Sequence, residues 1–310
     1  MKLLSCLIAI DGGGTKTETL LLREDGHILC RHVTSGCNAL DIGRQQAGEM
    51  LLNAIEQMLP RAPEQVESIF CGIAGNCHNY GAIAQYLRPR VKAPYLQVYD
   101  DTYNVISSVL GHGEGCGLVA GTGSSLLVRT REVCRHIGGW GYLIDTGGSG
   151  YVLGRDAIYR ALRAVDGRSG ATILTELLHR QLGEPVEQAM TQIYAGGRSF
   201  IASLAHVVFE GREAGDDAAT AIFDQGAERL AELVSAAERY FPGEYSVVLG
   251  GGLFAAYPEY VEAVRRRCPG QARLLTTDMP VVYGAAVEAL EATGKTPGRE
   301  FHDHFLEDYR

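Results

Sequence analysis

The sequence predicts an α/β fold of two domains in which the same order of elements, β-β-β-α-β-α-β, occurs twice. Short apolar runs separated by glycine-rich turns indicate strands, and apolar residues at helical spacing between the later runs indicate helices. The order recurs in the second half of the chain with a long helical insertion. With 310 residues, of which 46% are hydrophobic and 21% charged, the chain is long enough to build two buried cores.

The first half begins with three strands joined by tight turns, which predicts an antiparallel start to its sheet. Glu24-Asp25-Gly26 is typical of a hairpin turn between the second and third strands. The expected elements are strands at 3–10, 17–23 and 27–34, a helix at 44–59, a strand at 68–73, a helix at 80–87 and a strand at 95–99.

The second half repeats this order around a long helical stretch. The expected elements are strands at 116–120, 125–130 and 132–137, helical structure over 153–240, a strand at 245–249, a helix at 258–267, a strand at 272–276 and a helix at 281–292. Two such units with mixed sheets facing a cleft form the ribonuclease-H-like architecture. The glycine-rich linker Gly111–Gly115 predicts domains of residues 1–113 and 114–310, with the last helix packing back on the first domain.

Composition excludes several classes of partner. The net charge is −9, and basic runs such as Arg265–Arg267 are short, so no basic face is expected for nucleic acid or an anionic membrane. The apolar start through Ile10 is too short for a signal peptide or a membrane span and is better explained as a buried strand. Eight scattered cysteines without a Cys-x-x-Cys pair are interpreted as reduced core thiols of a cytoplasmic protein.

The strongest local motif follows the first strand. Asp11 is placed to hold hydrated Mg²⁺, and the next residues offer backbone N–H and hydroxyl donors to a phosphate. A plain hairpin turn is the alternative, but an aspartate directly after a buried strand favours a cation. The phosphate-binding candidates are Gly12, Gly13, Gly14, Thr15, Lys16 and Thr17.

Two further glycine loops occupy related positions in the second half. One follows the first strand of that half, so the two halves together would clamp phosphates from both sides; its residues are Gly121, Thr122, Gly123 and Ser124. The other ends a strand and opens a helix, where bare backbone can lie against a base or ribose, although a tight turn alone would also explain it. Its residues are Gly250, Gly251 and Gly252.

An acidic pair ends the last strand of the first half. Transfer of phosphate to a hydroxyl needs a carboxylate that accepts the hydroxyl proton, and a strand end facing the cleft suits it. We assign Asp101 as this base and Asp100 as a helix cap or neighbour.

Three other motifs are interpreted as having no role in the chemistry. Gly294-Lys295-Thr296 resembles a P-loop only in part, because a helix precedes it and Ala289 replaces the first glycine. Neither the Cys71, Cys77 and His78 set nor His302-Asp303-His304 has a complete set of metal ligands. We interpret them as core thiols and a solvated tail.

Together these loops and the strand-end aspartate resemble the acetate kinase, hexokinase, Hsp70 and actin superfamily. Gly138-Gly139-Trp140-Gly141-Tyr142 followed by Gly148-Ser149-Gly150-Tyr151 is more closely similar to the N-acetylglucosamine kinase group of the BadF/BadG/BcrA/BcrD ATPase family. This resemblance implies duplicated ribonuclease-H-like (actin-like ATPase) domains around a nucleotide cleft. It also implies use of ATP and Mg²⁺, transfer to an amino-sugar hydroxyl, usually the 6-hydroxyl, and a homodimer.

Residues carry over from the family position by position. Asp101 resembles the base that activates the sugar hydroxyl, and Asn38 the asparagine that binds sugar hydroxyls. Thr122 resembles a loop residue that also touches the sugar. Gly72, Ala74 and Gly75 match a loop on the sugar side. Trp140, the only tryptophan, is a candidate face for the sugar ring, with a core position as the alternative.

The sequence departs from the group after the tryptophan. The group usually carries Gly-Asp-Glu-Gly-Ser there, whereas this chain has Ile144-Asp145-Thr146-Gly147-Gly148-Ser149. Either Asp145 contacts the sugar from a shifted turn, or the substrate differs from N-acetylglucosamine. Glucosamine, N-acetylmuramic acid or another sugar therefore stay open as substrates.

Two rival functions are weighed against the kinase. One is an activator ATPase of 2-hydroxyacyl-CoA dehydratase or benzoyl-CoA reductase, which needs closely spaced cysteines for an iron-sulfur cluster that this sequence does not offer. The other is a sugar-sensing regulator, which would carry an added DNA-binding helix pair. Since the chain begins at its first strand and carries Asp101, we expect the kinase.

Overall fold

The computed structural model describes residues 5–75, 80–145 and 147–310. The chain divides into two compact units. The first comprises the residues up to Gly117 together with Thr276–Arg310, and the second is Leu118–Leu275. The sequence-based division assigned residues 114–310 to the second domain and expected only the last helix to pack back on the first domain. In the structure two helices return, because both bury apolar residues against the first sheet.

The first unit is built on a five-stranded sheet of order β3-β2-β1-β4-β5. β1, β2 and β3 are antiparallel, as the tight turns predicted, whereas β1, β4 and β5 run parallel. The carboxyl ends of β1, β4 and β5 therefore lie at one edge of this sheet. The strands are β1 (Cys6–Gly12), β2 (Lys16–Arg23), β3 (Ile28–Ser35), β4 (Val66–Ile73) and β5 (Tyr95–Asp100).

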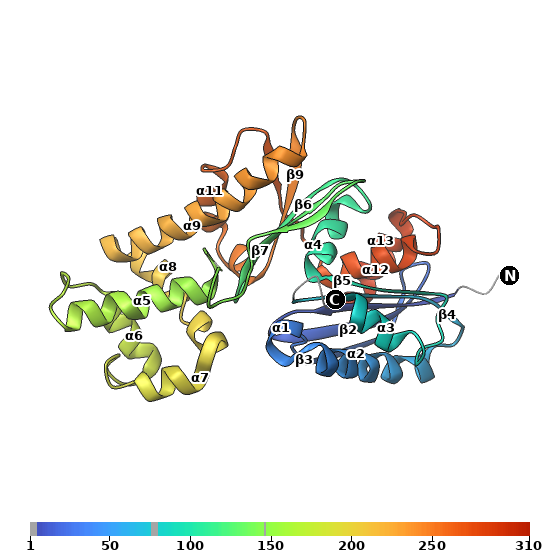
Figure 1. Ribbon diagram of the computed structural model, residues 1–310, viewed down its shortest axis with the longest axis horizontal. Helices are drawn as coiled ribbons and strands as arrows, with labels where there is room; N and C mark the ends of the chain where they lie inside the picture. The colour runs from blue at the N-terminus through green and yellow to red at the C-terminus, as the bar shows by residue number, and fades with distance from the viewer. Residues whose placement is uncertain (1–4, 76–79, 146) are drawn as a thin grey trace. The chain divides into compact units, whose positions relative to one another are not determined.

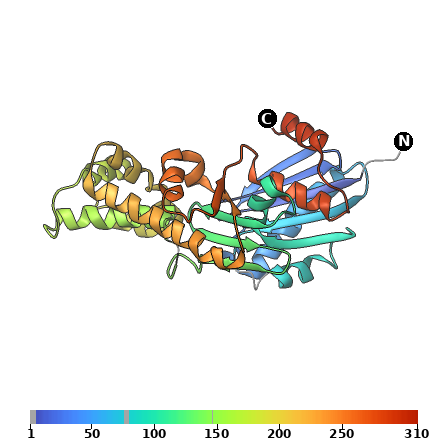
Figure 2. The same cartoon turned by 90° about the horizontal axis from the view of Figure 1, so that it is seen from above.

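Helices cover both faces of this sheet (Figures 1 and 2). Alternate residues of β1 separate the two cores: Ile8 packs in the core beneath α2 and α3, whereas Leu7 packs in the core beneath α12 and α13. The helices are α1 (Ala39–Ile42), α2 (Arg44–Met58), η1 (Leu59–Arg61), α3 (Tyr80–Leu87), α4 (Asp101–Leu110), α12 (Val281–Glu291) and α13 (Arg299–Tyr309).

The interpretation of the C-terminal residues as a solvated tail is wrong. Residues 299–309 form α13, and its Phe301 and Phe305 are 3% and 0% exposed in the core they share with α12. The amphipathic spacing of these two phenylalanines supplies the burial that holds the helix. Lys295, in the segment that resembles a P-loop in part, pairs with Glu24 at the start of the β2–β3 turn.

The second unit repeats the topology of the first. Its sheet has the order β10-β9-β6-β7-β8, which matches β5-β4-β1-β2-β3 strand for strand. The predicted duplication is therefore confirmed at the level of the sheets. The strands are β6 (Gly115–Ala120), β7 (Ser124–Arg129), β8 (Cys134–Ile137), β9 (Tyr245–Gly250) and β10 (Ala272–Leu275).

The predicted helical stretch of the second unit is a set of separate helices between β8 and β9 (Figure 1). α9 packs on β7, β8, α5, α8 and α11, so it connects the helices to the sheet. The helices are α5 (Gly150–Val165), α6 (Leu174–Leu182), α7 (Met190–Ser203), α8 (His206–Glu213), α9 (Asp217–Ala237), η2 (Glu238–Tyr240), α10 (Gly252–Ala256) and α11 (Pro258–Arg265).

Most described cysteines are apolar side chains of the core. Cys6, Cys37, Cys71 and Cys116 are all 0% exposed, and burial raises the pKa of the Cys37 and Cys116 thiols to about 12. Cys134 differs, since it is exposed. Cys77 and His78 lie outside the described residues. Among the described helices, none has the length and apolar character needed to cross a membrane.

Candidate active site

The first glycine motif forms the tight hairpin between β1 and β2. The N–H of Gly13 donates to the carbonyl oxygen of Lys16 at 2.9 Å, which closes a four-residue turn. Gly14, Thr15 and Lys16 are exposed on this turn, whereas Thr17 is buried beneath it at 3% exposure. Lys16 Nζ lies 3.3 Å from Glu18 Oε2. The turn therefore presents backbone N–H groups, a hydroxyl and an ammonium group to solvent.

Asp11 lies one residue before the end of β1, paired with Gly72 of the parallel strand β4. Its Oδ1 accepts a hydrogen bond from Asn104 Nδ2 at 2.7 Å. Burial raises the pKa of Asp11 to about 6, the Asn104 hydrogen bond opposes this rise, and the nearby Glu18 carboxylate adds to it. The carboxylate is thus held at the sheet edge at an electrostatic cost.

Asn104 was missed by sequence reasoning, although it is 0% exposed on α4. A Cβ at Gly72 would lie 2.2 Å from Asn104 Oδ1, and one at Gly284 would lie 1.8 Å from the Asn104 carbonyl oxygen. Two glycines therefore make room for this asparagine. Its signal in the sequence is a polar residue among the apolar residues that follow the acidic pair, three positions after Asp101.

The acidic pair at the end of β5 is divided into two roles. Asp100 is 4% exposed and caps α4, since its Oδ1 accepts from the Thr102 N–H at 3.0 Å. Its Oδ2 accepts from Tyr80 Oη at 2.6 Å. The interpretation of Asp100 as a cap is confirmed, and Asp101, which is only partly buried, is the member of the pair that keeps access to solvent.

The pKa of Asp101 is raised well above the ordinary aspartate value. Burial is the main cause, and repulsion from Asp100 and then Asp11 adds to it. The carboxyl ends of β1 and β5 lie at the same sheet edge on either side of β4, and Asn104, three residues after Asp101, binds Asp11. Asp11 and Asp101 therefore form one group of carboxylates at this edge. Such a cluster can accept a proton from a bound hydroxyl group or hold a divalent cation.

The loops after β3 and β4 bring two further sequence-predicted residues to this edge. The Ala39 N–H donates to the Ala74 carbonyl oxygen at 3.0 Å, and the Ala74 N–H donates to the Gly12 carbonyl oxygen at 2.6 Å. Asn38 caps α1, with its Oδ1 accepting from the Leu40 N–H at 2.9 Å. Gly75 has φ +145°, and a Cβ there would approach Ala39 to 3.0 Å.

In the second unit, the loop between β6 and β7 contacts the start of α5. The Gly121 N–H donates to the Gly123 carbonyl oxygen at 2.9 Å, and the Gly121 carbonyl oxygen accepts from the Gly150 N–H at 2.8 Å. Ser124 Oγ donates to the Gly147 carbonyl oxygen at 2.7 Å. The loop therefore has the predicted place after the first strand of its sheet, and the hydrogen bonds to 147–150 fix its shape.

The third glycine loop lies beside this one. Gly250 ends β9 and Gly252 begins α10, as predicted. Gly251 has φ +99°, and a Cβ there would lie 2.4 Å from the Ala120 carbonyl oxygen at the end of β6. Only glycine fits that backbone, so the close approach of the β6 and β9 ends depends on it.

Trp140 is 63% exposed, so the alternative of a core position is wrong. It precedes a turn in which the Asp145 N–H donates to the Gly141 carbonyl oxygen at 2.9 Å. Leu143 and Ile144 in this turn are 78% and 81% exposed, while Asp145 is partly buried. Thr146 lies outside the described residues.

The structure therefore assembles the predicted residues into two sets. The first unit collects Asp11, the hairpin 12–17, Asn38, Gly75 and Asp101 at one edge of its sheet. The second unit collects the loops 121–124 and 250–252 at the ends of β6 and β9, with the exposed turn that follows Trp140 next in the chain to α5.

Curated relatives match about three quarters of the chain. An N-acetyl-D-glucosamine kinase from Dictyostelium discoideum is 26% identical over 250 residues, which are 74% of this chain and 77% of that protein. An N-acetylmuramic acid/N-acetylglucosamine kinase from Clostridium acetobutylicum is 28% identical over 233 residues, which are 72% and 76% of the two chains.

Solved structures share the fold. A protein from Chromobacterium violaceum, provisionally named an N-acetylglucosamine kinase, superposes with a TM-score of 0.72 at 24% identity, over 93% of this chain and 99% of that one. A glucokinase of the ROK family from Streptomyces griseus superposes with a TM-score of 0.60 at 16% identity, over 94% and 100%. These likenesses agree with two ribonuclease-H-like units. Residues 8–289 match the BadF/BadG/BcrA/BcrD ATPase family, and the chain belongs to that family.

Proposed function

We propose that this protein is an ATP-dependent kinase that phosphorylates an amino sugar of the N-acetylglucosamine or glucosamine type. The observation that carries the proposal is the partly buried Asp101, which lies beside a helix-capping aspartate and interacts with Asp11 at the carboxyl ends of parallel strands. Two curated relatives that cover most of the chain are kinases of N-acetylglucosamine or N-acetylmuramic acid.

In the proposed reaction Asp101 accepts the proton of a sugar hydroxyl group. The hydroxyl oxygen forms a bond to the γ-phosphorus of ATP as the bond from that phosphorus to the bridging oxygen of ADP breaks. The raised pKa of Asp101 makes its carboxylate a stronger base than an ordinary aspartate. We propose that the 6-hydroxyl is the acceptor, as the family resemblance implies.

The donor set at the sheet edge fits the divalent cation that such a reaction uses. Asp11 and Asp101 are partly buried, and their pKa values are raised, so the folded chain holds negative charge that a cation would neutralise. We propose that Asp11 holds hydrated Mg²⁺, whose charge would offset that of the phosphate oxygens when it is bound. Asn104 positions Asp11 through its 2.7 Å hydrogen bond.

The remaining roles follow the chemistry of each loop. We propose that Gly12, Gly13, Gly14, Thr15, Lys16 and Thr17 in the first unit, and Gly121, Thr122, Gly123 and Ser124 in the second, surround the phosphates. Gly250, Gly251 and Gly252 would lie against the nucleoside. Since Thr17 is buried, its part is to support the turn, and Gly14, Thr15 and Lys16 offer the exposed groups.

For the sugar, we propose Asn38, Gly75 and Asp101 in the first unit. The Oδ1 atom of Asn38 caps α1, so its amide Nδ2 is the group available to donate to a sugar oxygen. In the second unit we propose Thr122, Asp145 and the exposed Trp140, whose ring offers an apolar face. A cytoplasmic location and a homodimer are part of the proposal, the former supported by the buried thiols.

The test is sugar-dependent ADP release. The purified chain with Mg-ATP is given glucosamine, N-acetylglucosamine, N-acetylmannosamine, N-acetylmuramic acid or glucose, against a blank without sugar. Release confined to one or two amino sugars supports the proposal. Release that is indifferent to every sugar would instead favour an activator-type ATPase.

The Asp101→Asn variant tests the base. It is expected to lose about 10²- to 10⁴-fold or more in kcat while binding ATP as the wild type does. In the wild type, kcat/KM should rise with pH through a pKa well above 3.8, because the carboxylate must be ionised to accept the proton. Near-wild-type turnover by Asp101→Asn would remove Asp101 from this role.

A further inference from the structure

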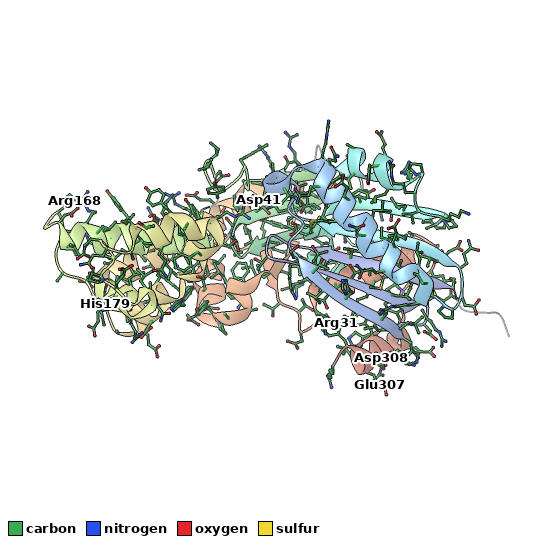
Figure 3. All side chains as sticks on the ribbon, turned by 90° about the horizontal axis from the view of Figure 1, so that it is seen from below. Arg31, Asp41, Arg168, His179, Glu307 and Asp308 are labelled. Atoms are coloured by element: carbon green, nitrogen blue, oxygen red, sulfur yellow. The ribbon has the colours of Figure 1, made fainter. Side chains whose placement is uncertain are left out.

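The turn between β2 and β3 lies against α13 and places two histidines and two aspartates together. A Cβ at Gly26, which has φ +98°, would lie 2.2 Å from the carbonyl oxygen of Phe301. The backbones of turn and helix are therefore in direct contact. Asp25 and His27 come from the turn, and His304 and Asp308 come from the helix. Figure 3 shows Asp308 on α13 near Arg31 of β3, at the edge of the first sheet.

The two imidazole rings are stacked and oriented by oxygen acceptors. Their centroids are 3.8 Å apart with an interplanar angle of 16°. His27 Nδ1 lies 2.9 Å from Asp308 Oδ2, and His304 Nδ1 lies 2.9 Å from the carbonyl oxygen of Asp25. An oxygen acceptor at Nδ1 selects the tautomer that carries its proton there, which leaves the lone pair on Nε2.

This pattern is the one by which proteins orient histidines that bind metals through Nε2. Asp308 is itself fixed, because its Oδ2 also accepts from the Ile28 N–H at 2.9 Å. The Asp308 carboxylate is therefore held in place as an acceptor for His27.

A carboxylate completes a set of three ligands. One ligand atom each from Asp25, His27 and His304 lies within 4.8 Å of the other two, and all three residues are partly buried. Two ligands at about 2.0–2.1 Å from a tetrahedral zinc ion are separated by roughly 3.4 Å. Because the stacked rings direct their in-plane lone pairs almost parallel to each other, one imidazole must also turn out of the stack before the three atoms reach bonding distance.

We infer that Asp25, His27 and His304 form a binding site for a zinc-class divalent transition metal that fastens α13 to the β2–β3 turn. Two imidazoles and one carboxylate match the donor preference of Zn²⁺, and water would complete the tetrahedron. The site is separate from the carboxylate cluster of the proposed kinase, and the inference does not depend on that function.

A second cluster in the first unit, formed by His112, Glu288 and Glu291, differs from the proposed metal site in the contacts of its histidine. His112 Nδ1 lies 3.6 Å from Glu288 Oε2, and its Nε2 lies 3.1 Å from Glu291 Oε2. Both ring nitrogens of His112 therefore face carboxylate oxygens. In the His27 and His304 pair, each ring has an oxygen acceptor at Nδ1 only, among the contacts of the described residues.

The test is metal binding by the full chain after treatment with a chelator and desalting. Co²⁺ is titrated and followed by its visible absorption, and Zn²⁺ is titrated by calorimetry. One equivalent of Co²⁺, displaced by Zn²⁺, is expected. Zn²⁺ should also raise the Tm of the wild type, because it binds the folded state. Absence of both signals in the wild type would overturn the inference.

Three variants assign the ligands. His304→Asn keeps a donor for the Asp25 carbonyl oxygen but lacks Nε2, and it should abolish the Co²⁺ spectrum and the rise in Tm. Asp308→Asn keeps an acceptor for His27 but removes its charge, and it should weaken binding about 10- to 100-fold. His302→Asn is the matched control, two residues away on α13 and paired with Asp303.

The outcomes separate binding from folding. The Tm of each variant in chelator shows whether it is folded before metal is added. If folded His304→Asn binds Co²⁺ as the wild type does, or if His302→Asn weakens binding equally, the site assigned here is wrong. Loss of binding in His304→Asn with full binding in His302→Asn supports it.

Discussion

Replacing Asp11 by asparagine is expected to stabilise the first unit of the protein while it abolishes phosphate transfer. The asparagine Oδ1 can still accept the 2.7 Å hydrogen bond from Asn104 Nδ2. What the substitution removes is a partly buried charge whose ionisation is opposed by burial and by Glu18. The wild-type residue thus lowers stability in order to keep a carboxylate at the sheet edge.

The magnitude follows from the pKa of Asp11. Because it is raised from 3.8 to about 6 in the folded state, at about 1.4 kcal/mol per pH unit the ionised carboxylate costs roughly 3 kcal/mol above pH 6. Because the pKa of Asp11 is higher in the folded than in the unfolded state, proton binding stabilises the folded state fully at pH values below 3.8. This stabilisation is lost as the pH rises through about 6. The advantage of Asp11→Asn should therefore be roughly 3 kcal/mol at pH 8 and about half of that at pH 5.

Urea unfolding of both proteins at pH 8 and pH 5, without nucleotide or divalent cation, measures this difference. Asp166→Asn is the control, because Asp166 is an exposed partner of Arg168 on the surface of the second unit, and its effect should stay within about 0.5 kcal/mol. Equal stability of Asp11→Asn and the wild type at pH 8, or a difference that does not shrink toward pH 5, would refute the reasoning.

Three other substitutions test the packing and the proposed contacts. Gly251→Ala should destabilise the second unit by about 1–3 kcal/mol or more, since its Cβ would lie 2.4 Å from a backbone oxygen; urea unfolding beside Gly243→Ala, where a Cβ meets open space, checks this. Phe305→Ala should cost about 3–5 kcal/mol, and a Tm unchanged from the wild type would show that α13 is not part of the core. Trp140→Ala should leave stability within about 0.5 kcal/mol but raise the KM for the sugar, and an unchanged KM in the steady-state assay would exclude the ring contact.

The sheets and their glycine turns were predictable because their signals are local. A buried strand such as β1 is a run of apolar residues, and the turn that follows contains the glycines that a close backbone approach requires. Every expected strand is present within a few residues of its predicted bounds. The aspartates at strand ends could be placed for the same reason, because parallel strands bring their carboxyl ends to one edge.

Contacts between distant parts of the sequence were not predictable. α13 was missed because its burial depends on α12 and β2. Its short sequence is rich in charged residues, and only Phe301 and Phe305 indicate a buried helix face. The buried position of Asn104 could not be predicted, because it depends on the space that Gly72 and Gly284 leave for it. The stacking of His27 on His304 joins residues 277 positions apart, and no local sequence pattern predicts it.

The return of residues 276–310 to the first unit has a consequence for synthesis of the chain. The second unit, Leu118–Leu275, is a continuous segment inserted into a discontinuous one. At 5–20 residues per second, the ribosome needs roughly 8 to 33 s to make the about 160 residues between Gly117 and α12. During that interval the face of the first sheet formed by Leu7, Leu20 and Phe70 lacks α12 and α13, so the nascent first half leaves an apolar surface uncovered until these helices have been made.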